Sequence, residues 1–100
     1  PGIGMILHTL NRSPLESTVY RQALRALAED DKLLLIEDGV LGALPAQQAL
    51  WSSLPGRLLA LAEDLEARGL SEHCATGIEV VDVDGFVRLT EEADKVVSWY

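Results

Sequence analysis

Residues 33–40 read LLLIEDGV, and this octapeptide gives the first indication of the fold. Four large apolar residues in succession, with no polar alternation, are typical of a strand that is covered on both faces at the centre of a parallel sheet. The residues Glu37, Asp38 and Gly39 then end the strand. Ligands of open α/β sheets gather at the carboxyl ends of the strands, so a site is expected here. The simpler interpretation is a plain turn in which Asp38 caps the following helix.

Strands and helices alternate on both sides of this strand. After the first strand we expect a helix with Ser13 as its cap, Pro14 as its first position and apolar residues at helical spacing from Leu15 to Leu27. Gly69 is expected to end a later helix in a left-handed conformation. The expected strands span 5–10, 33–36, 57–61, 78–81 and 95–99, and the expected helices span 14–27, about 45–52, 63–68 and 84–92. The pattern predicts an α/β three-layer sandwich, flavodoxin-like or Rossmann-like, with a mostly parallel five-stranded sheet and helices on both faces.

The length and the charge of the chain limit the possible functions. One hundred residues are enough for one domain, which we assign to residues 5–100. Residues 1–4 precede Met5, the expected natural start, and are interpreted as a remnant of cloning. With no apolar run near the roughly 20 residues that span a bilayer, and no signal-peptide pattern, we expect a cytoplasmic protein without membrane contact. The net charge of −8 repels phosphate backbones, so no direct nucleic-acid binding is expected.

The sequence lacks the common motifs for catalysis, cofactors and metals. No glycine-rich phosphate loop follows the first strand, and His8 and His73 lack the spacing of zinc ligands. The single cysteine, Cys74, excludes an internal disulfide and a cysteine-based zinc site. We therefore expect no catalytic residues, no cofactor and no metal.

The candidate binding residues lie at the predicted strand ends. His8, near the end of the first strand, is expected close to Asp38 at the end of the second. The two could form an acid–base couple, although a structural hydrogen bond fits the general habit of buried polar groups better. Next to them, the loop of Asn11, Arg12 and Ser13 is a candidate site for a small anion.

Four segments of the chain resemble the DsrH/TusB family. They are LHTLNRSP at residues 7–14, LLIEDGV at 34–40, EDLEARGL at 63–70 and GFVRLT at 85–90. Their order and spacing are similar to those of the family and cover nearly the whole chain from Met5 to Trp99. The resemblance implies the α/β fold of the DsrE, DsrF and DsrH proteins.

The same resemblance implies a role in sulfur relay. Members of the family assemble with two paralogues, of the DsrE/TusD and DsrF/TusC types, into a heterohexamer with two copies of each subunit. One branch passes persulfide sulfur toward 2-thiolation of the wobble uridine in tRNA, and the other serves intracellular sulfur oxidation. The main sulfur-carrying cysteine lies on the DsrE/TusD-type subunit. The sulfur-oxidation branch also has a cysteine in the first helix of its DsrH chain, where this sequence has Ala23. We therefore expect a non-catalytic subunit of the tRNA-thiolation branch.

Apolar residues after the central strand are candidates for the subunit interface. Leu41, Leu44, Leu50 and Trp51 form either this patch or part of the core of a monomer. Without its partners the chain could also form a homo-oligomer.

Two other function classes stay open. One is a stand-alone module that binds a small anion at the 11–13 loop. The other is a redox or sulfurtransferase enzyme that uses Cys74. We expect Cys74 to be a passive thiol, because it precedes the fourth strand, at the edge opposite the ligand-binding edge, and because the charge of Glu72 opposes thiolate formation.

Overall fold

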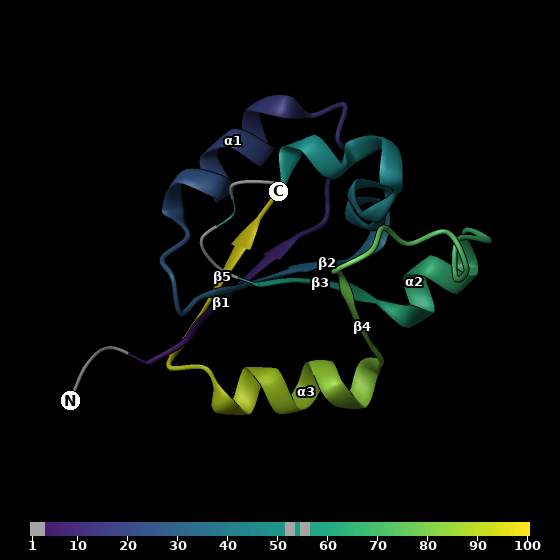
Figure 1. Cartoon of the computed structure of the whole chain (residues 1–100). Coiled ribbons are helices and arrows are strands. Elements are labelled where there is room, and N and C mark those ends of the chain that lie inside the picture. The colour runs from purple at the N-terminus through teal and green to yellow at the C-terminus, as the bar shows by residue number, and fades with distance from the viewer. Residues whose placement is uncertain (1–3, 52–53, 55–56) are drawn as a thin grey trace.

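The computed structural model describes residues 4–51, 54 and 57–100. Figure 1 shows a twisted sheet with helices above and below it. The strands are β1 (Ile6–Leu10), β2 (Lys32–Leu35), β3 (Arg57–Leu61), β4 (Glu79–Val81) and β5 (Lys95–Trp99). The α-helices are α1 (Ser17–Ala26), α2 (Ala62–Ala67) and α3 (Val83–Glu92), and two 3₁₀ helices, η1 (Glu37–Ala43) and η2 (Pro45–Leu50), connect β2 to β3. Residues 1–3 of the predicted cloning remnant, and the predicted helix end at Ser52, lie outside the described residues.

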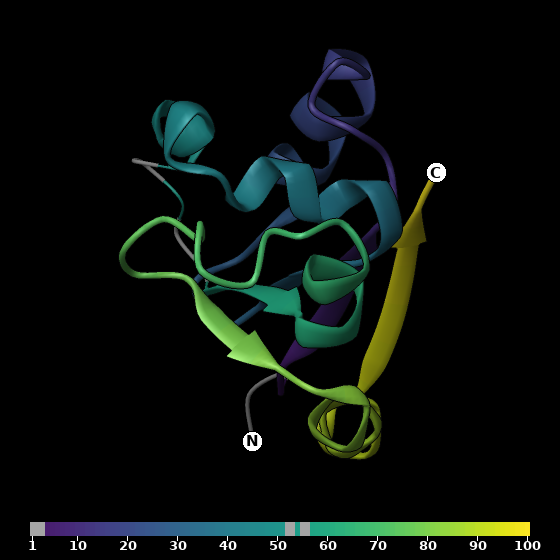
Figure 2. The same cartoon turned by 90° about the vertical axis from the view of Figure 1, so that its right-hand side faces the viewer.

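The sheet has the strand order β4-β3-β2-β1-β5, and every neighbouring pair is parallel. The predicted α/β sandwich with a central β2 is therefore confirmed. Crossovers between parallel strands are right-handed. The chain moves in one direction across the sheet from β1 to β4, so the helices of these connections lie on one face of the sheet. It returns in the opposite direction from β4 to β5, so α3 lies on the other face. Figures 1 and 2 show α1 and α3 on these opposite faces.

The alternating side chains of β2 join two separate parts of the core. Leu33 and Leu35 pack into the larger cluster with Tyr20 of α1. Leu34, which points the other way, packs into the smaller cluster with Leu89 of α3. All three leucines of β2 are fully buried, as the apolar run predicted. The helices thus cover both faces of the central strand.

Gly69 ends α2 in the predicted left-handed conformation, with φ at 69°. The Leu70 N–H donates to the Leu65 carbonyl at 2.8 Å, and the Gly69 N–H donates to the Glu66 carbonyl at 3.0 Å. This pair of bonds is the Schellman motif, which satisfies carbonyls that the helix end leaves without partners. Among the described helices, none is both long and apolar enough to cross a membrane.

The prediction for the start of the first helix is wrong. Ser13 does not cap α1, because its Oγ accepts from the Leu15 N–H at 3.2 Å and its carbonyl accepts from the Glu16 N–H at 2.9 Å. These bonds close a turn ahead of the helix, which then begins at Ser17. Leu15, predicted on the apolar face of the helix, lies on this turn and is 93% exposed.

The connection from β2 to β3 also differs from the prediction. We expected a short turn and then a helix from about residue 45 to 52. The helix is present as the 3₁₀ helix η2 (Pro45–Leu50), but in place of the short turn a first 3₁₀ helix already begins at Glu37, two residues after the end of β2. Leu44 interrupts the helical structure in an extended conformation, with ψ at 149°. A residue that precedes proline is pushed toward extended backbone, so Pro45 explains the break between η1 and η2.

Candidate functional site

Polar side chains from three neighbouring strand ends meet at the carboxyl edge of the sheet. Asp38, just after β2, accepts hydrogen bonds from Arg68 at the end of α2, at 2.8 Å from Nη2 and 3.3 Å from Nε. Arg68 Nη1 also donates to the Asp64 carbonyl at 3.2 Å. Within the described part of the chain, η1 begins without a side-chain cap, so the expected capping role of Asp38 is wrong. Asp38 is instead the partner of a partly buried arginine.

The backbone at Glu37 is held in an uncommon conformation. Its φ is 50°, in the left-handed region that side chains other than glycine seldom adopt. Its N–H donates to Asp64 Oδ2 at 2.6 Å, and its carboxylate accepts from Asn11 Nδ2 at 3.4 Å. Two residues later the chain passes so close to β1 that a Cβ at Gly39 would collide with the carbonyl oxygen of Leu10. The tight turn thus requires a glycine at this position.

The three residues of the candidate anion loop make their contacts within the chain. Arg12 lies 3.6 Å from the Glu16 carboxylate, and both side chains are about half exposed. Asn11 faces Glu37, and its buried Oδ1 has no hydrogen-bond partner among the described residues. The Ser13 hydroxyl oxygen accepts a hydrogen bond from the Leu15 N–H, within the turn that precedes α1. Two carboxylates border this loop and would oppose an anion, so the anion site stays a prediction.

The predicted pair of His8 and Asp38 is wrong. His8 is buried, and its Nε2 lies 3.0 Å from Asp31 Oδ2. The strand register explains the difference, since His8 is opposite Leu33, near the start of β2 rather than its end. The side chain therefore reaches Asp31, immediately before β2. His8 makes a structural hydrogen bond, as buried polar groups usually do, but its partner is Asp31 at the opposite edge of the sheet and not Asp38.

Asp31 is a buried carboxylate that no pattern in the sequence distinguishes from its acidic neighbours Glu29 and Asp30. Besides His8, it accepts from the N–H of Ala28 at 3.0 Å and from the N–H of Ile6 at 3.3 Å. Burial opposes its ionisation, but the hydrogen bonds from Ala28, His8 and Ile6 outweigh this effect and hold the pKa of Asp31 below its ordinary value. The acidic residues before an apolar strand were a visible signal, but their pattern does not tell which of them points inward.

Trp51, one of the four candidate interface residues, belongs to the core. Its indole N–H donates to the Gly42 carbonyl at 2.6 Å, and its ring packs against Tyr20 with 5.5 Å between centroids. The other three candidates, Leu41, Leu44 and Leu50, are half-buried. The most exposed large apolar side chains in the described part of the chain are Leu15 at 93% and Tyr100 at 75%.

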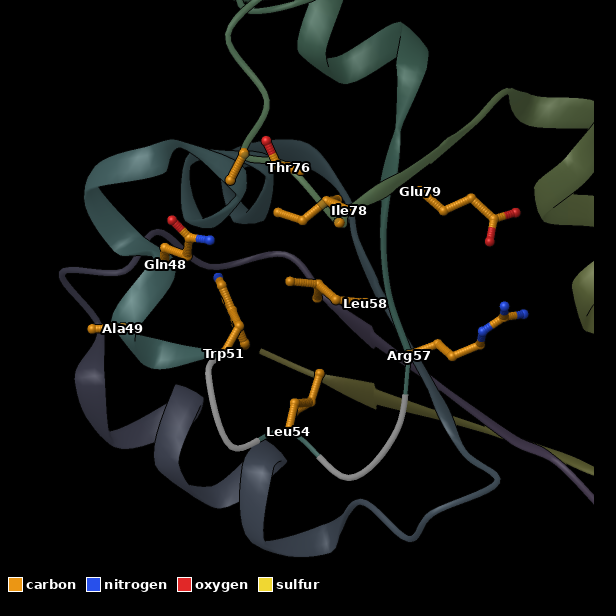
Figure 3. Close-up of a pocket in the computed structure, with 11 residues that line it drawn as sticks. Gln48, Ala49, Trp51, Leu54, Arg57, Leu58, Thr76, Ile78 and Glu79 are labelled. Atoms are coloured by element: carbon orange, nitrogen blue, oxygen red, sulfur yellow. The ribbon is translucent and has the colours of Figure 1, made fainter.

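A cavity of about 600 Å³ lies at the amino edge of the sheet, beside the starts of β3 and β4. Figure 3 shows Trp51, Leu58 and Ile78 around it and Arg57 and Glu79 at one side. No sequence pattern indicates this cavity, because two separate connections and the first residues of two strands line it.

Cys74 directly precedes residues 75–77, which line this cavity, in the connection that leads into β4. The predicted position of the thiol at the amino edge of the sheet is therefore correct. Burial raises the pKa of the Cys74 thiol, and a hydrogen bond with the Ala75 backbone offsets only part of this rise. Across the described residues, no group of three or more histidine, cysteine or acidic side chains could hold a metal ion.

Comparisons with known proteins place the chain in a family. The family described as DsrH like protein matches residues 12–96. Proteins named TusB from Escherichia coli K12 and Shigella boydii serotype 18 are each 42% identical over 96 residues, which cover 94% of this chain and 100% of each relative. The crystal structure of the ychN protein from E. coli has a TM-score of 0.75 at 20% identity and covers 97% of this chain and 100% of its own. The solution structure of Tm0979 from Thermotoga maritima has a TM-score of 0.66 at 26% identity, and the match covers 87% of this chain and 92% of Tm0979. The chain belongs to the DsrH/TusB family, as its four sequence segments predicted.

Proposed function

We propose that this chain is a non-catalytic subunit of a cytoplasmic sulfur-relay complex that passes persulfide sulfur toward 2-thiolation of the wobble uridine in tRNA. The observation that carries the proposal is the 42% identity, over their whole length, to proteins named TusB. The partners are DsrE/TusD-like and DsrF/TusC-like subunits, as the family implies. Ala23, in the middle of α1, stands where a DsrH chain of the sulfur-oxidation branch would have its cysteine. This difference favours the tRNA branch.

The environment of Cys74 supports a role that involves no sulfur transfer by this chain. A relay step requires a thiolate to attack the outer sulfur of a persulfide, so the receiving cysteine must ionise readily. Cys74 is half-buried with a raised pKa, which lowers the fraction of thiolate at neutral pH. The sulfur therefore stays on a partner subunit throughout, and this chain shapes the complex.

Two exposed side chains support a partner surface at the carboxyl edge of the sheet. Leu15 and Tyr100 follow the carboxyl ends of β1 and β5, which are neighbours in the sheet. The strand order reverses here, because β1 connects to β2 on one side while β5 lies on the other. Such a reversal is where open α/β sheets usually bind their ligands. We assign one partner contact to this place, and keep Leu41, Leu44 and Leu50 as candidates for a second.

Modified nucleosides test the pathway directly. Deletion of the gene should remove 2-thiouridine from the wobble position of the tRNAs for lysine, glutamate and glutamine, and the intact gene should restore it. Mass spectrometry of digested tRNA measures the modification. If thiouridine is unchanged and the oxidation of sulfur compounds is impaired, the chain serves the sulfur-oxidation branch instead. The acidic chain alone should show no salt-sensitive tRNA binding.

Assembly is tested by co-expression with the two paralogues, followed by size-exclusion chromatography with light scattering. The wild-type chain should co-elute with both partners. Leu15→Ser should weaken association about tenfold or more, because burying a leucine contributes about 1.5–3 kcal/mol. The matched control is Val87→Ser, since Val87 is 50% exposed on α3, on the opposite face of the sheet. A complex that forms without this chain, or equal effects of the two variants, would contradict the proposal.

A further inference from the structure

The hydrogen bonds around His8 fix the position of its proton. The Trp99 indole, at the end of β5, places its Nε1 3.1 Å from His8 Nδ1. An indole N–H can only donate, so Nδ1 must be the unprotonated, accepting nitrogen. The proton is therefore on Nε2 and is donated to Asp31 Oδ2 at 3.0 Å. His8 is neutral in this arrangement, and both ring nitrogens are in use.

A second proton on His8 would affect the two bonds in opposite ways. The bond to Asp31 would become charge-assisted and stronger, because the carboxylate then faces an imidazolium. At the other nitrogen, a new N–H would point at the indole N–H, whose nitrogen lies 3.1 Å away. Two donors would then face each other at a side chain that is 3% exposed. An unsatisfied buried donor is unfavourable, because it has lost its hydrogen bonds to water without gaining a partner. The hydrogen bond between the indole and His8 would therefore break, while the hydrogen bond between His8 and Asp31 would remain.

The surroundings make Asp31 the charge that responds to this proton. Among the described residues, Asp31 is the charged group in contact with His8. The elements packed around the His8 ring carry three further cations, which are exposed: Lys95 on β5, and Arg21 and Arg25 on α1. Lys32, next to Asp31, lies with α3 at a hollow on the other face of the sheet.

The indole is one of two side-chain attachments near the end of β5, which is an edge strand beside β1 (Figure 1). The other is the Ser98 hydroxyl, which accepts from Thr9 Oγ1 at 3.2 Å. The last backbone bond between the two strands, from the Asn11 N–H to the Trp99 carbonyl, is long at 3.5 Å. The Trp99 side chain packs against the larger core cluster and is partly buried. Loss of its hydrogen bond would therefore loosen the end of the strand and the adjacent Tyr100.

We propose that His8 is a proton-operated latch, whose neutral form holds Trp99 and whose protonated form releases it, so that acidification loosens the carboxyl end of β5. The proposal rests on this geometry alone and is independent of the proposed role in sulfur relay. Trp51 provides an internal reference, because its indole donates to a backbone carbonyl with no titratable partner.

Nitrogen-resolved NMR of the ¹⁵N-labelled chain tests the latch. At neutral pH, long-range ¹H–¹⁵N spectra should show His8 protonated at Nε2 and unprotonated at Nδ1. During acid titration, the Trp99 indole resonance should shift with the same midpoint as the His8 ring, while the Trp51 indole resonance stays in place. His73→Gln removes the exposed second histidine and should leave this behaviour unchanged.

Three results would overturn the latch. One is a neutral-pH tautomer with the proton on Nδ1. Another is a His8 ring that becomes doubly protonated without any shift of the Trp99 indole. The third is loss of the Trp51 signal at the same midpoint, because His8 would then gain its proton only as the whole chain unfolds.

Discussion

Removal of the Asp31 carboxylate should destabilise this protein more than any other single change to a charged group. Asp31 is 3% exposed and accepts hydrogen bonds from His8 and from two backbone N–H groups, those of Ile6 and Ala28. These donors lie on β1 and on the turn after α1, so one side chain joins three parts of the chain. Asp31→Ala would leave all three donors without their acceptor.

The expected magnitude follows from the number of donors. The His8 donor is buried and costs about 1–3 kcal/mol when it is left unsatisfied, whereas the bonds from Ile6 and Ala28 are only partly buried and each contribute less. Asp31→Ala should therefore lower the free energy of unfolding by about 2 kcal/mol or more. Asp31→Asn keeps one acceptor oxygen and should lower it by about 1–3 kcal/mol, because its amide nitrogen would face at least one N–H donor. Asp30→Asn is the matched control, since Asp30 is exposed and adjacent in sequence, and should change the free energy by less than about 0.5 kcal/mol.

Urea unfolding followed by circular dichroism measures these differences, and pH gives a second test. The hydrogen bonds hold the pKa of Asp31 below its ordinary value, so its contribution is complete above the unfolded value of about 3.9. It is lost as the pH falls through the folded pKa. The difference in unfolding free energy between wild type and Asp31→Asn should therefore be present at neutral pH and disappear below about pH 4. Equal stability of Asp31→Asn and Asp30→Asn at pH 7 would refute the reasoning.

Three further predictions follow from single contacts. Cys74→Ser should leave the rate of tRNA thiolation by the assembled complex within about twofold of wild type, or about 0.4 kcal/mol on the rate scale. The alkylation rate of the wild-type thiol should increase with pH, with a midpoint above that of a free cysteine, because burial raises the pKa of Cys74. A persulfide trapped on Cys74 by mass spectrometry would contradict this. Gly39→Ala should lower stability by about 1–3 kcal/mol in thermal unfolding, because the new methyl group meets the Leu10 carbonyl oxygen; an unchanged melting temperature would count against the tight turn. Arg68→Met should cost no more than about 1 kcal/mol in urea unfolding, because its ion pair with Asp38 is partly exposed; a much larger loss would mean that the pair is buried in solution.

The sequence patterns identified the sheet better than its connections. The apolar run before Glu37 and the alternation of strands and helices were enough to place β2 at the centre, since few arrangements bury a strand on both faces. The start of α1 was placed too early, because Ser13 and Pro14 satisfy the rules for a cap and a first helical position equally well inside a turn. Local rules could not separate these two uses of the same residues.

The partner of His8 was mistaken for a different reason, which lies in the geometry of parallel pairs. In such a pair, which residues are opposite depends on the register, and a shift of a few positions moves a side chain from one edge of the sheet to the other. His8 is opposite Leu33, so it lies over the beginning of β2 and meets Asp31, while Asp38 beyond the other end meets Arg68. Both carboxylates flank the same apolar strand, but only the inward one joins β1, β2 and β5 into a hydrogen-bonded chain through His8. His8, which was expected at the ligand-binding edge, therefore acts inside the protein, and at the carboxyl edge Asp38 and Arg68 bind each other instead.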